Sequence, residues 1–347
     1  MSATSLRVGI LGYGAIGRTH HRAISECAGV EVVAATRSRT GATGDEDRAL
    51  AWCADAEELI GRPDIDVIAI CTPSGSHASL TIQALQAGKH VVVEKPLCIE
   101  LGSGERAVRL AQDSGLLLSV ISQRRFEPQN VHLRRLLDED ALGRPILGEA
   151  LVRWYRDQDY YDSAPWRGTL ADDGGVLLNQ AIHAVDLLCW LLGPVVQVSA
   201  TTATLAHEME AEDTAVATLT FASGALGVVA ASTATRPGLP AELNLFFERG
   251  AVGIHDDEIV RWDVPVSAPT AAAGASAGSG AADPGSVTAV GHLRQWCDIA
   301  AALRDGREPA VTGADGLATA AVVLAAYQSG RTGRAVRPAE AARVAAR

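Results

Sequence analysis

The feature that most restricts the fold is a glycine-rich turn between an apolar run (6–11) and a stretch with helical patterning (15–26). The turn consists of Gly12, Tyr13, Gly14, Ala15, Ile16 and Gly17. Glycines at these positions permit a tight turn, a close approach of the backbone to a ligand, and close packing of helix on strand. At the first strand-to-helix connection, this pattern predicts a dinucleotide site with phosphates at the helix N-terminus.

Residues 1–125 alternate between strand-like and helix-like segments. Further apolar runs lie at 30–35, 66–71, 90–94 and 116–121, and helical stretches lie at 77–87 and 104–113. We expect Gly88 to cap the helix that precedes it. Continuous apolar strands separated by helices are typical of a parallel sheet that is covered on both faces. The sequence therefore predicts a doubly wound α/β domain of the Rossmann type over residues 1–125.

Residues 126–347 have a different rhythm. Helices are expected at 129–138, 175–192, 291–303 and 313–329, strands at 147–156, 195–205, 215–221, 226–232 and 243–247, and loops at 157–166 and 268–286. Strands with alternating polarity and short turns predict a large, open, mainly antiparallel sheet with one packed face. We expect this part of the chain to bind the substrate and to form the contacts between subunits. Its C-terminal helices can pack back on the first domain.

Composition excludes several classes of partner. The net charge of −11 disfavours nucleic acid and anionic membrane surfaces. No apolar run reaches the roughly 20 residues of a membrane span, and the N-terminus lacks a signal-peptide pattern. The six cysteines form no C-x-x-C pair, which indicates reduced thiols and a cytoplasmic protein without a disulfide framework or metal site.

The end of the second predicted strand bears on the choice of cofactor. Residues 36–39 are Thr36, Arg37, Ser38 and Arg39, with no acid to hold a ribose 2′-hydroxyl. Hydroxyl and guanidinium groups suit a 2′-phosphate. The pattern favours NADP(H), with NAD(H) as the possible alternative. If these residues bind no cofactor, they form an ordinary solvated basic turn. We expect further cofactor contacts from Thr72, Pro73, Ser74, His77, Glu94, Lys95, Gln123, Trp166 and Arg167.

Lysine is almost absent from the chain. Of the 30 Lys and Arg residues, only Lys89 and Lys95 are lysine. A lysine amine can lose its proton, whereas a guanidinium stays charged. Lys95 follows the predicted strand 90–94, at the carboxyl edge of the sheet where ligands bind in open α/β domains. The pattern indicates a functional amine at Lys95, although a surface lysine beside Pro96 remains the structural alternative.

A narrow polar stripe interrupts the apolar helix predicted at 175–192. Asn179, His183 and Asp186 fall within about 60° of one another on an α-helix. Such a stripe must find buried partners or face a cavity, so a satisfied His–Asp pair in the core is the alternative to a functional site. A metal site is not expected here, because the sequence offers no third ligand at a suitable spacing. Aromatic and guanidinium groups of the preceding segment, at Arg153, Tyr155, Trp166 and Arg167, suit a polyhydroxylated ring.

These residues give the sequence a resemblance to the Gfo/Idh/MocA family, named for glucose–fructose oxidoreductase and inositol dehydrogenase. The matching pieces are the glycine turn 12–17, Cys71-Thr72-Pro73 with His77, the stretch 88–96 ending in Glu94-Lys95-Pro96, Trp166-Arg167, Gly174-Gly175, Asn179…His183…Asp186, Glu212-Asp213-Thr214, and Tyr327-Gln328-Ser329 with Thr332-Gly333-Arg334. The resemblance spans nearly the whole chain. It implies a Rossmann domain followed by an open-sheet domain that is often paired between subunits.

The resemblance implies an oxidoreductase that moves a hydride between NADP(H) and a hydroxyl or keto carbon of a sugar, sugar derivative or cyclitol. We expect His183 to transfer the proton, because histidine titrates near neutral pH. Lys95 would hydrogen-bond the same oxygen, and Asn179 and Asp186 would orient the substrate and the imidazole. Many family members carry Asp where this chain has Asn179, which argues against a strict inositol-dehydrogenase assignment.

Three other functions are compatible with the same residues. The first is a glycosidase that retains NAD(P) and acts by transient oxidation. The second is a non-catalytic sensor of NADPH, and the third is a reductase of a non-sugar ring. An uncovered apolar sheet face would need burial, so we expect a homodimer or homotetramer formed through the open sheet.

Overall fold

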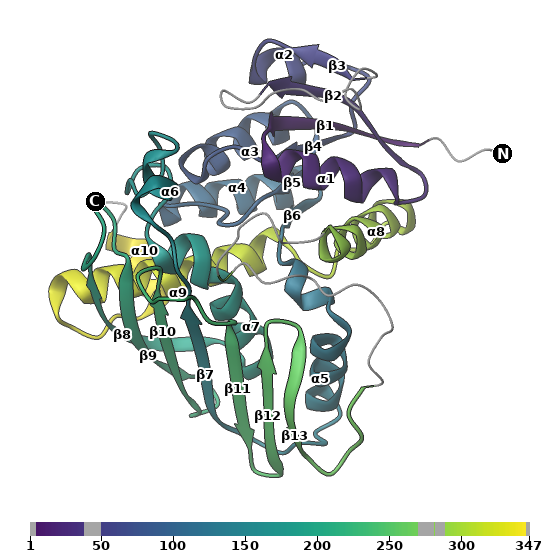
Figure 1. The fold of residues 1–347 in the computed structure, drawn as a ribbon. Helices are drawn as coiled ribbons and strands as arrows, with labels where there is room; N and C mark the ends of the chain where they lie inside the picture. The colour runs from purple at the N-terminus through teal and green to yellow at the C-terminus, as the bar shows by residue number, and fades with distance from the viewer. Residues whose placement is uncertain (1–4, 38–49, 270–280, 282–288, 345–347) are drawn as a thin grey trace. The chain divides into compact units, whose positions relative to one another are not determined.

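The computed structural model describes residues 5–37, 50–269, 281 and 289–344. The chain folds as two compact units (Figure 1). The first unit contains Met1–Gln123 and Ala289–Leu317, and the second contains Arg124–Thr288 and Ala318–Arg347. Residues 289–317 thus return to the first unit before the chain enters the second unit again.

The first unit is built on a six-stranded parallel sheet with the order β3-β2-β1-β4-β5-β6. Its strands are β1 (Leu6–Tyr13), β2 (Val30–Arg37), β3 (Ala51–Cys53), β4 (Val67–Ile70), β5 (His90–Val93) and β6 (Leu118–Val120). Its helices are α1 (Ala15–Ser25), α2 (Ala56–Ile60), α3 (His77–Gln86), α4 (Leu101–Ser114) and α8 (Val290–Asp305). The predicted doubly wound α/β domain is confirmed.

Burial on both faces explains why these strands are continuously apolar. Along β4, Ile68 and Ile70 pack into a core under α2, α3 and α4. The alternate residues Val67 and Ala69 pack on the other face, in a core that includes residues of α1 and α8. Because successive side chains of a strand point to opposite faces, every position of β4 had to be apolar.

Two elements of this unit were not predicted. β3 has three residues at the sheet edge, and α2 has five. Segments this short carry too few apolar positions to show a period. The expected glycine cap is confirmed, since Gly88 follows α3 with φ 77° and its N–H donates to Leu85 O.

The second unit contains a seven-stranded sheet with the order β13-β12-β11-β7-β10-β9-β8, antiparallel except for the pair β7–β10. Its strands are β7 (Pro145–Arg153), β8 (Val195–Ala203), β9 (Thr214–Phe221), β10 (Leu226–Ser232), β11 (Glu242–Phe247), β12 (Gly250–His255) and β13 (Glu258–Asp263). Its helices are α5 (Pro128–Asp138), α6 (Gln158–Asp162), α7 (Ile182–Leu192) and α10 (Pro338–Val344), together with most of α9 (Gly313–Thr332). The predicted mainly antiparallel sheet is confirmed.

One face of this sheet is tightly packed and the other is open. A Cβ atom at Gly148 of β7 would lie 2.4 Å from Leu192 Cδ1 of α7, so the helix sits directly on the strand there. On β9, Ala215, Ala217 and Leu219 are buried, whereas Val216 between them is 52% exposed. Other large apolar side chains are exposed on strands of the same sheet, at Ile146, Val196, Leu226 and Val260.

The structure corrects two predictions in this unit and adds three elements that were not predicted. The helix predicted at 175–192 is a π-helical turn at Leu177–Ala181 followed by α7, because hydrophobic patterning does not distinguish 3.6 from more residues per turn. The loop predicted at 157–166 contains α6, which Asp157 caps by accepting a hydrogen bond from Tyr160 N. Strands β12 and β13 and helix α10 were missed.

Most of the loop predicted at 268–286 lies outside the described residues. Among the helices that are described, none is long and apolar enough to cross a membrane.

Candidate functional site

The glycine-rich turn of the first unit leaves no room for side chains at two of its positions. Gly12 has φ 89°, and a Cβ atom there would lie 2.7 Å from Cys71 O. A Cβ atom at Gly17 would lie 2.4 Å from Gly12 O. Gly14 is the N-cap of α1 and has no side chain to occupy the helix N-terminus. The turn therefore presents bare backbone and the first N–H groups of α1, which suits a pyrophosphate.

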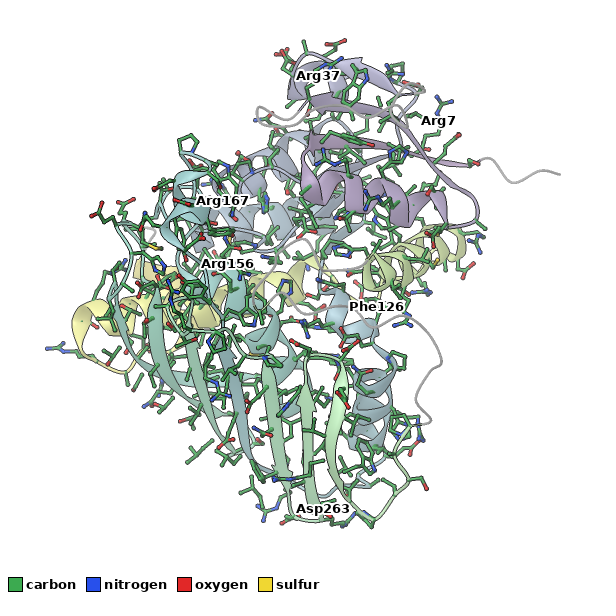
Figure 2. The ribbon with its side chains drawn as sticks, viewed as in Figure 1. Arg7, Arg37, Phe126, Arg156, Arg167 and Asp263 are labelled. Carbon is green, nitrogen blue, oxygen red and sulfur yellow. The ribbon has the colours of Figure 1, made fainter. Side chains whose placement is uncertain are left out.

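The end of β2 carries the residues expected to select the cofactor. Thr36 Oγ1 accepts a hydrogen bond of 2.9 Å from Gly12 N, which ties the end of β2 to the glycine turn. Arg37 is exposed, and its guanidinium carbon lies 4.8 Å from the ring centre of Trp52 on β3 (Figure 2). Stacking occupies one face of the guanidinium and leaves its in-plane N–H groups available for a phosphate. Ser38 lies outside the described residues.

Residues after β4 and β5 are held together by His77. Its imidazole lies 2.7 Å from Thr72 O through Nε2 and 2.7 Å from Pro96 O through Nδ1. Burial lowers the pKa of His77, so the neutral ring donates to one of these carbonyls at a time. Ser74 starts the 3₁₀ turn after Pro73. We therefore assign His77 a structural role at this sheet edge.

The two lysines differ in their surroundings. Lys89 donates from Nζ to Arg62 O and Ile65 O, at 2.8 Å each, which gives it a structural role. Lys95 lies two residues after the end of β5 and is half-buried. Its main-chain N–H donates 3.2 Å to the carboxylate of Glu94, whose side chain is buried in the protein. Glu94 thus holds the backbone that leads into Lys95.

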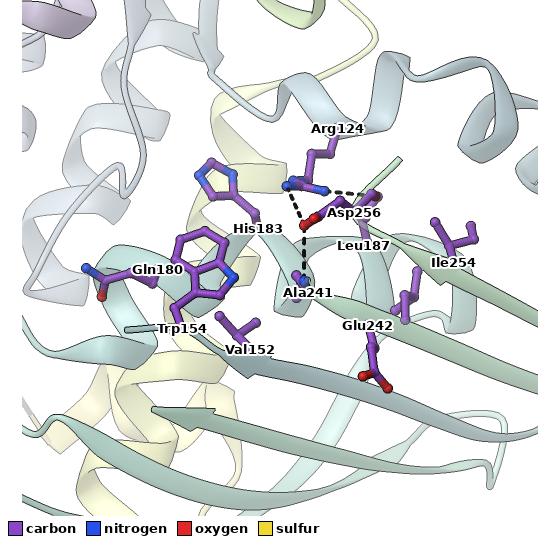
Figure 3. Close-up of a pocket in the computed structure, with 12 residues that line it drawn as sticks. Arg124, Val152, Trp154, Gln180, His183, Leu187, Ala241, Glu242, Ile254 and Asp256 are labelled. Atoms are coloured by element: carbon purple, nitrogen blue, oxygen red, sulfur yellow. Dashed lines mark hydrogen bonds and ion pairs between the residues drawn. The ribbon is translucent and has the colours of Figure 1, made fainter. Parts of the chain in front are cut away.

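His183 of the second unit lines a small, open pocket (Figure 3). The pocket is lined by Arg124, Val152, Trp154, Gln180, His183, Ala184, Leu187, Ala241, Glu242, Leu243, Ile254 and Asp256. Apolar side chains of β7, α7, β11 and β12 form much of this wall. The remaining wall is polar, so the pocket has the character of a small-molecule site.

Trp154, rather than the predicted Arg153 and Tyr155, faces this pocket. Side chains alternate along β7 and just beyond it, so that Val152, Trp154 and Arg156 are buried, whereas Arg153 and Tyr155 are partly exposed. Arg153 forms an ion pair with Glu242. The Trp154 Nε1 atom is buried and has no hydrogen-bond partner among the residues that the structure describes.

Arg124 and Asp256 close one side of the pocket. Arg124 donates 3.1 Å to the main-chain oxygen of Asp256, and its guanidinium lies 4.0 Å from the Asp256 carboxylate. The same carboxylate accepts a 3.0 Å hydrogen bond from Ala241 N. The charge of Arg124 is therefore balanced by a neighbouring acid.

Asn179 lies in the π-helical turn and contacts an acid that the sequence did not indicate. Its side-chain amide donates to the carboxylate of Asp173, which is buried. The other oxygen of Asp173 accepts a 2.8 Å hydrogen bond from Gly168 N. Asp173 therefore connects Asn179 to the loop that follows Trp166 and Arg167. Asn179 lies in a π-helical turn, which has more residues per turn than an α-helix. The common face expected for Asn179 and His183 on an ideal α-helix therefore does not apply.

Asp186 has contacts that differ from the expected one with His183. Its carboxylate accepts two hydrogen bonds from Arg125, at 2.9 and 2.6 Å, and one of 2.9 Å from Thr319 Oγ1. All three side chains are buried. Bidentate geometry with a guanidinium is the arrangement of a structural ion pair. We therefore assign Asp186 to the packing of α7.

Trp166 and Arg167 form part of an aromatic–guanidinium cluster in the second unit. The Arg167 guanidinium lies 4.0 Å from the ring centre of Tyr160 and 4.8 Å from that of Trp166. Buried Arg156 lies 5.3 Å from the same Tyr160 ring. These stacks fix the segment that the sequence assigned to ligand binding.

Glu212 is a second acid whose contacts were not foreseen. Its Oε1 atom accepts 2.9 Å from Leu177 N and 3.0 Å from the Tyr327 hydroxyl. Burial raises the pKa of Glu212 to about 7. A Cβ atom at Gly175 would collide with the Glu212 carboxylate, so Gly175 makes room for it. Glu212 thus caps the π-helical turn that carries Asn179.

Comparison with known proteins agrees with this geometry. Residues 6–122 match the family model described as "Oxidoreductase family, NAD-binding Rossmann fold". Residues 130–253 match the model described as "GFO/IDH/MocA C-terminal domain". The two matches together cover the glycine-rich turn and most of the residues that line the pocket.

Three relatives illustrate the similarity. The chain is 29% identical to D-apiose dehydrogenase of Paraburkholderia graminis, over 94% of this chain and 88% of that protein. It is 29% identical to inositol 2-dehydrogenase of Rhizobium meliloti, over 94% of this chain and 97% of that protein. The crystal structure of the WlbA dehydrogenase from Bordetella pertussis, in complex with NADH and UDP-GlcNAcA, is 31% identical. It superposes with a TM-score of 0.84, covering 96% of this chain and 98% of that one. The chain therefore belongs to the Gfo/Idh/MocA family of NAD(P)-dependent oxidoreductases.

Proposed function

We propose that the protein is an NADP(H)-preferring oxidoreductase acting on a hydroxyl or keto carbon of a sugar, sugar derivative or cyclitol. The observation that carries the substrate class is the pocket beside His183. Its apolar floor and the unsatisfied indole N–H of Trp154 suit a ring that bears oxygen atoms. Sugar and cyclitol dehydrogenases among the relatives support the same class.

Thr36 and Arg37 support the preference for NADP(H). The bare glycine turn fits the pyrophosphate, and Thr36 brings the end of β2 against it. An acid at this strand end would repel a 2′-phosphate, whereas the stacked guanidinium of Arg37 attracts one. NAD(H) remains the alternative cofactor.

A nicotinamide held by the glycine turn would supply the hydride chemistry, as donor in reduction and as acceptor in oxidation. In reduction, we assign His183 to donate a proton to the oxygen on which negative charge develops. Lys95 donates a hydrogen bond to this oxygen and stabilises its charge. In oxidation both groups act in reverse. Loss of either group is expected to lower the rate by about 10²–10⁴-fold.

The test is a turnover assay that follows the absorbance of reduced nicotinamide. NADP and NAD are compared in both directions with aldoses, keto-sugars, inositols, anhydro-sugars and a nucleotide-sugar uronate. Turnover of one class that is lost in both Lys95→Ala and His183→Ala supports the proposal. Near-normal turnover in either variant contradicts the assigned role of that residue.

The same assay separates the other functions. A glycosidase would release a sugar without net reduction of the cofactor, and a sensor would bind NADPH without turnover of any substrate. Both outcomes would contradict the proposal, and the dehydrogenases among the relatives favour neither.

We further propose that the protein is cytoplasmic and forms a homodimer or homotetramer through the open sheet of the second unit. The cysteines of the described residues are free thiols, as expected in the cytoplasm. Val216 of β9 and Leu226 of β10 are exposed apolar side chains on adjacent strands, which a second copy can bury. Light scattering after gel filtration measures the mass, and Val216→Glu should shift it to the monomer. A wild-type monomer would refute the assembly.

A further inference from the structure

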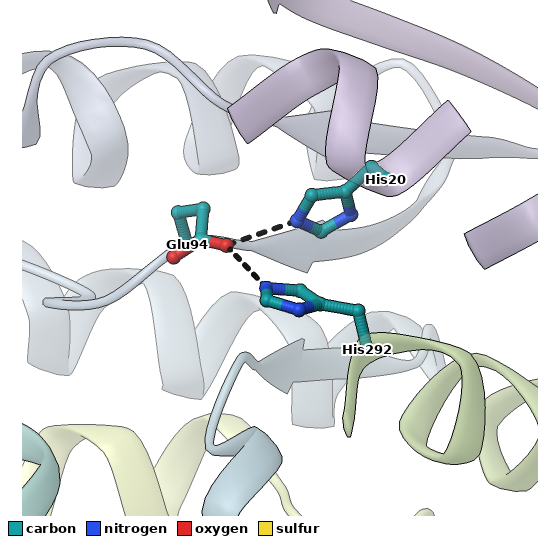
Figure 4. Close-up of side chains that lie close together, drawn as sticks. All are labelled: His20, Glu94 and His292. Atoms are coloured by element: carbon teal, nitrogen blue, oxygen red, sulfur yellow. Dashed lines mark hydrogen bonds and ion pairs between the residues drawn. The ribbon is translucent and has the colours of Figure 1, made fainter. Parts of the chain in front are cut away.

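Three buried side chains that are far apart in the sequence meet beside β5. Glu94 Oε1 lies 2.9 Å from His20 Nε2 and 3.3 Å from His292 Nε2 (Figure 4). His20 comes from α1, His292 from α8, and Glu94 directly follows β5. All belong to the first unit. Two imidazoles and a carboxylate also form the kind of donor set that can bind a divalent metal, so metal binding has to be decided first.

Trp296 fixes the proton on His20. The indole N–H of Trp296 lies 3.0 Å from His20 Nδ1, and an indole nitrogen can only donate. His20 Nδ1 must therefore accept, and the neutral ring carries its proton on Nε2, where it points at Glu94. Burial lowers the pKa of His20, which agrees with a neutral ring. A protonated Nε2 cannot ligate a metal, so this donor set favours a hydrogen-bonded network over a metal centre.

The hydrogen bonds of this network favour the ionised form of Glu94. Burial alone would raise the pKa of Glu94, but the hydrogen bonds from His20 and His292 lower it well below the ordinary value. The second carboxylate oxygen, Oε2, accepts the main-chain N–H of Lys95 at 3.2 Å. A hydrogen-bonded path thus runs from Trp296 through His20 and Glu94 to the backbone of Lys95.

We propose that His20, His292 and Trp296 are positioning residues for Lys95, which act by holding the Glu94 carboxylate against the Lys95 main chain. The inference rests on the proposed function, because Lys95 has its role only in that reaction. None of the three needs to touch substrate. Their buried negative partner accepts the Lys95 main-chain N–H and so orients the start of the Lys95 side chain.

A matched pair of variants at His20 tests the path. In His20→Gln, the amide oxygen can accept from Trp296 and the amide N–H can donate to Glu94, so both hydrogen bonds are retained. In His20→Leu both are lost. We expect kcat to fall by about 10–100-fold in His20→Leu and by less than about 3-fold in His20→Gln. The KM of the sugar substrate should change little in either variant. Equal losses in two variants that both bind NADPH like the wild type would overturn the proposal.

Glu94→Gln tests the carboxylate itself. Replacing the carboxylate by an amide removes one of the acceptor oxygens on which the path depends, so kcat should fall by about 10–100-fold, as in His20→Leu. The same substitution in a Lys95→Ala background should have almost no further effect on the residual rate, since the network acts through Lys95. An equal fold-loss in both backgrounds would refute the inference.

Two controls keep the outcomes separate. Normal turnover of Lys95→Ala would refute the proposed function rather than the network. The metal content of the purified protein, measured after dialysis with and without ZnCl₂, should be far below one ion per chain. A stoichiometric metal that is lost in His292→Ala would replace the positioning network by a metal site and overturn the proposal.

Discussion

The side-chain amide of Asn179 donates a hydrogen bond to the buried carboxylate of Asp173. This contact gives a physical reason for an amide at position 179. An aspartate there would set two carboxylates against each other in a poorly solvated place, which is unfavourable unless one is protonated.

We therefore predict that Asn179→Asp lowers both activity and stability. Like-charge repulsion and the lost hydrogen bond should reduce the free energy of unfolding by about 1–3 kcal/mol. The reversed pair, Asn179→Asp with Asp173→Asn, should recover much of this loss, because Asn at 173 can still accept from Gly168 N and donate to position 179. Urea unfolding of the single and double variants measures the coupling. Additive effects of the two substitutions would contradict the argument.

Glu212 predicts a pH dependence of stability. Its pKa is about 7 in the folded protein, above the ordinary value of 4.5. The group therefore contributes stability that is fully present below pH 4.5 and is lost as pH rises through about 7. The free energy of unfolding of the wild type should fall by up to about 3 kcal/mol across this window.

In Glu212→Gln this contribution should be absent, so the difference between wild type and variant should depend on pH. Chemical unfolding at several pH values measures it. A constant difference between the two proteins from acid to neutral pH would show that Glu212 does not titrate in this range.

Arg37 predicts a selective effect on the cofactor. Arg37→Ala should raise the KM for NADP by about 10–100-fold, because a charge-assisted hydrogen bond to phosphate is lost, and should leave the KM for NAD nearly unchanged. Arg109→Ala is a suitable control, since Arg109 is a surface arginine that pairs with Glu105 on α4. Equal effects of Arg37→Ala on both cofactors would argue against recognition of the 2′-phosphate.

We predict that a mild oxidant links Cys27 and Cys297 selectively. Their Sγ atoms lie 3.2 Å apart in the first unit, although 270 positions separate them in the sequence. The S–S bond of a disulfide is about 2.05 Å long, so the two sulfur atoms would have to move only slightly closer. A mild diazene oxidant would take two protons and two electrons from the thiols and be reduced to the hydrazine. Burial raises the pKa of Cys27 to about 12, so the reaction should be slow at neutral pH.

Peptide mapping under non-reducing conditions should find the Cys27–Cys297 linkage. Cys297→Ser should abolish it, whereas Cys98→Ser, which removes a buried cysteine elsewhere in the same unit, should not. Oxidation that links or modifies other cysteines first would contradict the prediction.

The architecture was predictable wherever burial dictates residue type. Strands buried on both faces, such as β4, need an apolar residue at every position, and glycine-rich backbone is required where Gly12 approaches Cys71 O. Short edge elements such as β3 carry no such requirement. Strand β12 begins with Gly250, and in β13 (EIVRWD) the polar and apolar residues do not alternate regularly, so apolar patterning did not mark the hairpin.

The site was predictable in its residue types but not in its contacts. Alternation along β7 could have indicated Trp154, because residues two positions apart face the same side and Val152 faces the core. The neighbouring Arg153 and Tyr155, however, have equally suitable chemistry. The contacts of Asp186 with Arg125 and Thr319, and of Glu94 with His20 and His292, join distant parts of the chain. Only the tertiary fold brings these groups together.

The two carbonyl oxygens bound by Lys89 give the chain an unusual chemical property. With the Lys89 amine held between Arg62 O and Ile65 O, its reaction with an acylating reagent is suppressed in the folded state. Since the sequence contains one other lysine, amine labelling of the native protein reports on Lys95 and the N-terminus. ¹³C-methyl groups introduced by reductive methylation would then place a spectroscopic reporter on Lys95 of the proposed active site, beside one on the N-terminus, without any engineered residue.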